Sequence, residues 1–167
     1  MTEGETQDRA GIWGGCACGA LRYRLLDAPM FVNCCHCTWC QRESGSAFAV
    51  NAVIETNRIA VEGAVESAHL PTASGKGQEL RRCMACKGVV YSHFAGAGPA
   101  IAFLKVGTLD QPALCPPQAH IYTATKQPWV VLAPGVPVFE QYYRMKEVWP
   151  AEALARRAKV TAGSAPR

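Results

Sequence analysis

The sequence predicts a mostly β protein that folds as a single domain with long loops and a short C-terminal helix. The 167-residue chain has the usual length of one domain, and 15 Gly and 11 Pro interrupt its short, β-leaning apolar segments. Only residues 151–160 are rich enough in Ala, Leu, Glu, Arg and Lys to predict a helix. We therefore expect a flexible N-terminus at residues 1–10, the domain at 11–145, and the helix and tail at 146–167.

The first strands are predicted from short apolar or alternating segments. In residues 20–26 (ALRYRLL), apolar side chains alternate with two arginines, which indicates a half-buried strand. A second strand at residues 30–34 (MFVNC) leads into a group of cysteines. Residues 46–55 and 58–63 are both β-leaning and only two residues apart, so we expect them to form a hairpin.

The second half of the chain adds further strands. We expect strands at residues 78–83 (QELRRC), 88–94 (GVVYSHF) and 100–107 (AIAFLKVG). Three prolines exclude regular structure from residues 109–118, and a strand is expected to resume over 120–132 (HIYTATKQPWVVL).

Composition narrows the function and the compartment. The formal charge is +4 and the pI about 8.6, too weakly basic to indicate nucleic-acid binding. No apolar run is long enough for a membrane span, and the polar start does not resemble a secretory signal. We expect a cytoplasmic protein, and the sequence leaves open whether it forms homo-oligomers. Thiols stay reduced there, so nine cysteines, an odd number, favour metal ligands over disulfides.

Two close cysteine pairs predict a structural zinc site. Cys16 and Cys18 form one pair, and Cys83 and Cys86 form another much later in the chain. Two such pairs on tight turns supply the four thiolates of a tetrahedral zinc, and Gly19 next to the first pair helps the backbone to turn. The alternatives are four ordinary buried cysteines or a disulfide.

The stretch CCHCTWC suggests a second, open metal site. Cys35, Cys37 and Cys40 provide three thiolates on one loop and leave a fourth position for water or substrate, as catalytic zinc sites do. His36 is a candidate fourth ligand, but its place between two ligands predicts that it points elsewhere. Cys34 alternates with Cys35 along the strand and is expected in the core.

Several other side chains have structural interpretations. Trp39 lies between two candidate ligands and is expected to shield the metal. His120 opens a predicted strand and is expected to be structural, and Cys115 is expected to be inert. Trp129 and Phe139 are expected in the core.

These motifs together resemble the glutathione-dependent formaldehyde-activating family, which includes the centromere protein V group. The resemblance covers residues 14–139 and depends on GGCACGALRY, CCHCTWCQRESGSAF, CMACKGVVY, VGTLD and HIYTATKQPWV, in that order. It implies a zinc-bearing β-tent fold with two zinc ions per chain. The structural site would comprise Cys16, Cys18, Cys83 and Cys86. The second would comprise Cys35, Cys37 and Cys40, as catalytic residues.

The resemblance also implies an activity. It is that of a zinc-dependent carbon–sulfur lyase of the S-(hydroxymethyl)glutathione synthase type, with glutathione as co-substrate and formaldehyde or a related aldehyde as partner. Three thiolates outweigh the charge of one zinc ion, so nearby cations are needed. Arg42 is the candidate glutathione contact, and Lys105 and Lys126 are further candidate cations, although solvated surface positions suit both lysines. Lys87 and Gln41 depart from the family pattern, which often has Gly and a basic residue there.

Two other functions are compatible with these cysteines. The protein could be a non-catalytic binding module that uses zinc only for folding, or a thiol or metal sensor, for which the adjacent Cys34 and Cys35 are the suggestive feature. An open second site with a bound sulfur ligand would favour the enzyme.

Overall fold

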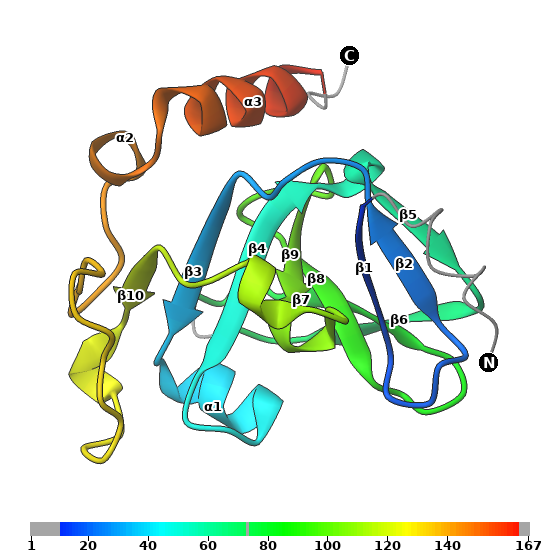
Figure 1. Cartoon of the computed structure of the whole chain (residues 1–167), viewed down its shortest axis with the longest axis horizontal. Helices are drawn as coiled ribbons and strands as arrows, with labels where there is room; N and C mark the ends of the chain where they lie inside the picture. The colour runs from blue at the N-terminus through cyan, green and yellow to red at the C-terminus, as the bar shows by residue number, and fades with distance from the viewer. Residues whose placement is uncertain (1–10, 73, 164–167) are drawn as a thin grey trace, which may run out of the picture.

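The computed structural model describes residues 11–72 and 74–163 and confirms the mostly β class (Figure 1). The expected flexible N-terminus at 1–10 and the last four residues of the tail lie outside the described residues. In chain order the strands and helices are β1 (Ile12–Gly15), β2 (Arg22–Leu25), β3 (Phe31–Cys35), α1 (Thr38–Ser44), β4 (Ala49–Glu55), β5 (Ile59–Glu62), β6 (Val65–Leu70), β7 (Gln78–Cys83), β8 (Val89–Phe94), β9 (Ile101–Lys105), β10 (Ala119–Ile121), α2 (Met145–Val148) and α3 (Ala151–Ala162).

The strands form two sheets. The small sheet has the order β1-β2-β5, and the large sheet has the order β10-β3-β4-β9-β8-β7-β6. Neighbouring strands are antiparallel, except that β10 runs parallel to β3. The two sheets share one core, in which Leu21 and Tyr23 from the region of β2 pack with Ile54, Val90 and Leu104 of the large sheet. The alternation of apolar residues and arginines at 20–26 arises because one face of β2 packs on this core and the other face points toward solvent.

A second core lies where the C-terminal helices return to the large sheet (Figure 1). Phe31 of β3 stacks on Trp149 with ring centroids 5.2 Å apart, and Ala153 of α3 is buried beside them. The Tyr143 hydroxyl donates to Asn33 Oδ1 at 2.7 Å and accepts from Trp149 Nε1 at 2.8 Å. These bonds join the segment before α2 to the middle of β3, the strand that ends at the cysteine loop.

The predicted hairpin is wrong. β4 pairs with β3 and β9, whereas β5 pairs with β2 in the other sheet. A single 3-10 turn at Thr56–Arg58 separates the two strands and carries the chain between sheets. Alternation and spacing predict the strands but not their partners, because both β4 and β5 have a buried face in the shared core.

Three further predictions need correction. The strand expected over 120–132 ends at Ile121, since a 3-10 turn at Thr123–Thr125 follows. Trp129 is 71% exposed rather than in the core, whereas Phe139 packs against the second core. The segment around Cys40 is the short helix α1, not a loop. Among the described helices, none has the length and apolar character of a membrane span.

Candidate metal centres and the adjoining cavity

The four paired cysteines come together at one end of the molecule. Cys16 and Cys18 lie in the turn between β1 and β2, and Cys83 and Cys86 lie at the turn between β7 and β8. Their four sulfur atoms are all within 4.8 Å of one another, and the Cys16–Cys18 and Cys18–Cys83 distances are 3.4 and 3.9 Å. A tetrahedral zinc with ~2.3 Å bonds to sulfur needs sulfur separations of about 3.8 Å, so this donor set fits zinc.

Local backbone geometry explains how each pair closes. Gly19 has φ of 76°, which lets the turn bring Cys16 back so that its sulfur accepts the N–H of Leu21 at 3.3 Å. Lys87 follows the second pair with φ of 62°, a left-handed conformation that glycine adopts more easily. The turn thus keeps a glycine-like shape although the sequence departs from the family pattern there.

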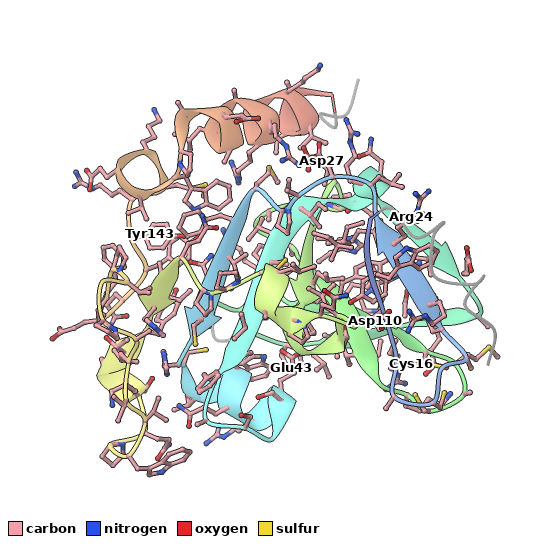
Figure 2. The ribbon with its side chains drawn as sticks, viewed as in Figure 1. Cys16, Arg24, Asp27, Glu43, Asp110 and Tyr143 are labelled. Carbon is pink, nitrogen blue, oxygen red and sulfur yellow. The ribbon has the colours of Figure 1, made fainter. Side chains whose placement is uncertain are left out.

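Cys35, Cys37 and Cys40 form a second group around the start of α1. Cys35 ends β3, Cys37 caps α1 by accepting the Cys40 N–H at 3.3 Å, and Cys40 is in the first turn. The three sulfur atoms lie within 4.8 Å of one another. Among the described residues, no further Cys, His, Asp or Glu joins this group, so the protein supplies three donors here and four at the other group. Figure 2 labels Cys16 at the four-cysteine group and Glu43 on α1, well apart in the molecule.

The three thiols are not equivalent in their protonation. Hydrogen bonds with the Cys35 and Cys40 thiols lower the pKa of Cys37 below its ordinary value, and backbone N–H groups add to this effect. The same contact with Cys37 raises the pKa of Cys35. Cys37 is also the most exposed of the three. The first thiolate of the group therefore forms on the sulfur that is easiest to reach, which suits a metal ligand.

His36 belongs to a different, fully buried group. Its Nε2 lies 3.0 Å from His120 Nδ1 and 3.5 Å from Cys34 Sγ, and all three residues are buried. Burial lowers the pKa of His36 to about 4, with further lowering by His120 and Lys126, so the ring is neutral. A metal here would leave His36 Nδ1 and His120 Nε2 as buried donors without partners, whereas metal-binding histidines normally donate that N–H. A hydrogen-bonded pair of neutral rings leaves only one such N–H without a partner among the described residues, so it fits better than a metal.

The backbone of His36 also joins the cysteine segment to β10 and to the turn that follows it. The His36 N–H donates to Ile121 O at 3.0 Å, and the His36 carbonyl accepts from Gln41 Nε2 at 2.7 Å and Thr125 Oγ1 at 3.1 Å. His120 is a structural residue in this arrangement, as expected, and Cys34 is buried. Gln41, the other departure from the family pattern, therefore serves to hold the loop.

The three candidate cations differ in their surroundings. Lys105 is half-buried and paired with Glu43 at 2.7 Å. A hydrogen bond with the Cys35 thiol and, to a smaller extent, the charge of Lys105 lower the pKa of Cys40, but Cys37 and burial outweigh them and leave this pKa raised. Lys126 donates to the carbonyls of Gln127 and Val130 at 3.0 and 2.8 Å. Arg42 is exposed. Its contact with glutathione stays a prediction.

A cavity of about 330 Å³ adjoins the three-cysteine group. All three cysteines line it, and five of the other ten lining residues are aromatic. These are Trp39, Phe94, Phe103, Tyr122 and Tyr142. Tyr122 directly follows β10 in a left-handed conformation with φ of 55°. Burial, followed by the three cysteines, raises the pKa of Tyr122, so its phenol keeps its proton at neutral pH. Trp39 thus lines the cavity beside the thiols, whereas the sequence predicts only that it shields the metal.

A hollow of about 460 Å³ continues from this cavity. It shares Phe94, Phe103, Tyr122 and Tyr142 with the first, and it is also lined by Lys76 and Arg157. Sequence reasoning missed these two cations, because they lie far from the cysteine motifs in the chain and carry no local pattern.

The fold and the two thiol groups define a mostly β protein with one four-donor and one three-donor centre suited to metal. The model of the glutathione-dependent formaldehyde-activating enzyme family matches residues 11–125, more than half of the chain, and the protein belongs to this family. A crystal structure of a Rhodobacter sphaeroides protein is similar, with 17% identity over 76% of this chain and 98% of that chain, and a TM-score of 0.45. No curated protein matches the chain.

Proposed function

We propose that the protein is a zinc-dependent carbon–sulfur lyase that forms or cleaves the adduct of glutathione with formaldehyde or a related small carbonyl compound. Cys16, Cys18, Cys83 and Cys86 would hold a structural zinc, and the second zinc would bind the three-cysteine group. The main support for this proposal is the contrast between a complete four-thiol group and a three-thiol group that adjoins a cavity. Family membership supports the reaction class.

The reaction joins a thiol to a carbonyl group without oxidation or reduction. A carbon–sulfur bond forms, and the thiol proton ends on the former carbonyl oxygen; cleavage reverses both changes. A zinc ion with one free coordination position would lower the pKa of a thiol bound there, or would polarise a carbonyl group. The chain contributes the Cys37 thiolate as the accessible ligand and the aromatic walls, which exclude water. The protonated Tyr122 phenol is a hydrogen-bond donor for the substrate oxygen.

Glutathione carries two carboxylates that need partners outside the uncharged cavity. Lys76 and Arg157 in the adjoining hollow are suitable, because among the described residues neither forms an ion pair with Asp or Glu. We propose them as the carboxylate contacts, with Arg42 retained as a candidate from the family resemblance.

Three cysteine variants test the two metal sites. Cys83→Ser should lose the structural zinc and much of the folded protein, because metal binding and folding are coupled there. Cys37→Ser should keep the fold and one zinc but lose the second. Cys115→Ser is the matched control, because Cys115 is buried outside both groups; it should retain both zinc ions. Metal content and circular dichroism are the measurements.

Activity is measured on the zinc-loaded protein by exchange NMR between free formaldehyde and its glutathione adduct. The wild type and Cys115→Ser should accelerate this exchange, and Cys37→Ser should not. If Cys37→Ser unfolds as completely as Cys83→Ser, the second group is structural, and the zinc-stabilised binding module is the better description. If Cys37→Ser keeps full activity, the three-cysteine group is not the reaction centre.

A further inference from the structure

The cavity beside the three thiols is much larger than formaldehyde requires. Formaldehyde adds one carbon and one oxygen to glutathione, whereas the cavity measures about 330 Å³, within the range of roughly 300–1,000 Å³ typical of organic ligand sites. A small adduct would leave most of this space to water against aromatic surface, at a cost in free energy.

The walls of the cavity select for flat apolar groups. Trp39, Phe94, Phe103, Tyr122 and Tyr142 come from separate parts of the chain and converge here. Phe94 and Phe103 meet edge to face with centroids 4.7 Å apart, and Tyr122 and Tyr142 lie 6.3 Å apart. Offset and edge contacts of this kind are how aromatic rings receive another ring.

No Lys, Arg, His, Asp or Glu is among the described residues that line this cavity. The glutathione backbone, with its carboxylates and ammonium group, is therefore a poor occupant. The charged portion matches the adjoining hollow with Lys76 and Arg157. This leaves the aromatic cavity for the carbonyl compound, since the sulfur must lie beside the cysteines that line it.

One side-chain oxygen in the cavity wall also lacks a hydrogen-bond partner among the described residues. Asn51 of β4 is only 7% exposed, lines the cavity, and has no hydrogen bond to its Oδ1 among the described residues. A buried amide oxygen without a partner is costly, and such atoms recur where a ligand completes the bonding. The Asn51 Oδ1 can accept a hydrogen bond from the hydroxyl group of a bound hemithioacetal.

We propose that the carbonyl substrate carries a flat apolar group about the size of a phenyl ring, which packs in the aromatic cavity while Asn51 hydrogen-bonds to the carbonyl-derived oxygen. This inference rests on the proposed function. The thiol adds across the aldehyde C=O: its sulfur bonds to the carbonyl carbon, the C=O π bond breaks, and the thiol proton passes to the oxygen. The addition involves no net oxidation or reduction of thiol and aldehyde.

The test compares two stable thioethers that mimic the adducts. S-Benzylglutathione places a phenyl ring where the aldehyde substituent would lie, and S-methylglutathione mimics the formaldehyde adduct. Isothermal titration of the zinc-loaded protein should give roughly tenfold to hundredfold tighter binding of the benzyl compound, the affinity expected from burying one ring. Exchange NMR should also show a higher kcat/KM for benzaldehyde, whose adduct the benzyl compound mimics, than for formaldehyde.

Variants locate the preference in the cavity. Phe103→Ala should reduce the benzyl-to-methyl affinity ratio at least fivefold, and Phe103→Leu, which preserves apolar volume in case Phe103→Ala does not fold, should reduce it less. Phe139→Ala is the matched control, because this half-buried phenylalanine packs on Tyr143 outside the cavity; it should keep the ratio.

The possible failures are distinguishable. If the methyl compound binds as tightly as the benzyl compound, or if Phe103→Ala and Phe103→Leu keep the full ratio, the inference about the carbonyl group is overturned while the proposed lyase stands. If neither thioether binds a protein that holds both zinc ions, the glutathione site itself is wrong, and both proposals are overturned.

Discussion

The ion pair between Arg156 of α3 and Glu55 of β4 should be a main attachment of the C-terminal helix. Arg156 Nε and Nη2 donate to the two carboxylate oxygens of Glu55 at 3.0 and 2.7 Å, and Nη1 donates to Ala28 O at 2.9 Å. The Glu55 side chain is only 10% exposed and that of Arg156 only 22%. Replacing Arg156 with Met would therefore leave a nearly buried carboxylate without its partner.

The expected loss follows from that geometry. Removing one partner of a buried ion pair costs roughly 3–5 kcal/mol, and the partial exposure of Arg156 reduces this to about 2–4 kcal/mol. For a chain of this length the loss lowers the midpoint of thermal unfolding by roughly 5–15 °C. Circular dichroism of the zinc-loaded protein measures the shift. Arg144→Met is the matched control, because Arg144 is 86% exposed; it should change stability by less than ~0.5 kcal/mol.

The pH dependence sharpens this prediction. Burial raises the pKa of Glu55, but the hydrogen bonds from Arg156 outweigh burial and leave it below 4.5. The stabilisation by the pair is therefore complete above pH ~4.5 and disappears as pH falls through the folded-state pKa. Arg156→Met removes the main interactions that lower the pKa of Glu55 while burial still raises it. Glu55 therefore protonates at higher pH in the variant, and the stability gap between variant and wild type should shrink from pH 7 to pH 4.

Two results would refute the reasoning. One is an Arg156→Met variant whose stability at pH 7 is within ~0.5 kcal/mol of the wild type, which would show that the pair contributes little. The other is a loss that stays constant between pH 7 and pH 4, because an unpaired Glu55 carboxylate could not then be its source. Adding Glu55→Gln to Arg156→Met should recover stability by removing the unpaired charge.

Three further predictions concern the turns and buried polar groups. Lys87→Gly should raise stability by roughly 0.5–1 kcal/mol in thermal unfolding, because glycine adopts the left-handed backbone without strain. This gain exceeds the loss of the exposed ion pair between Lys87 and Glu66. Lys87→Ala loses the same pair without relieving the strain, so it should not raise stability. Tyr143→Phe should cost about 1–3 kcal/mol in the same assay, since two buried partners lose their bond. His36, with a pKa of about 4, should stay neutral at pH 5.5 in imidazole ¹⁵N spectra; its contribution to stability is complete above pH ~6.5 and decreases as pH falls toward 4.

The spacing of the cysteines in the sequence predicts which thiols lie together in the structure. Two close pairs converge although 65 residues separate Cys18 from Cys83, because donors on two tight turns can share one point. The three thiols around Cys37 were predicted by closeness in sequence. Helix α1 was missed because its short segment has no apolar periodicity, and its cap is the sulfur of Cys37, which is not among the usual capping side chains.

Features that depend on strand pairing could not be read from local patterns. His36 meets His120 across 84 residues because β10 lies parallel to β3, and no local pattern specifies that neighbour. The same holds for the cavity, whose aromatic walls come from α1, β8, β9 and segments beyond β10. The exposure of Trp129 has no sequence signal either, since an aromatic residue after a proline suits a core or a surface equally well.

Two adjacent arginines on α3 link stability to the proposed binding site. Arg156 is held by Glu55 and Ala28, whereas Arg157 lines the hollow beside the cavity and forms no ion pair among the described residues. Because residues one apart on a helix point in different directions, the pairing of one arginine fixes the direction of the other. Arg156→Met should therefore weaken the binding of anionic glutathione thioethers even at temperatures where the variant is folded. Arg157→Met should weaken binding as much or more without the same loss of stability.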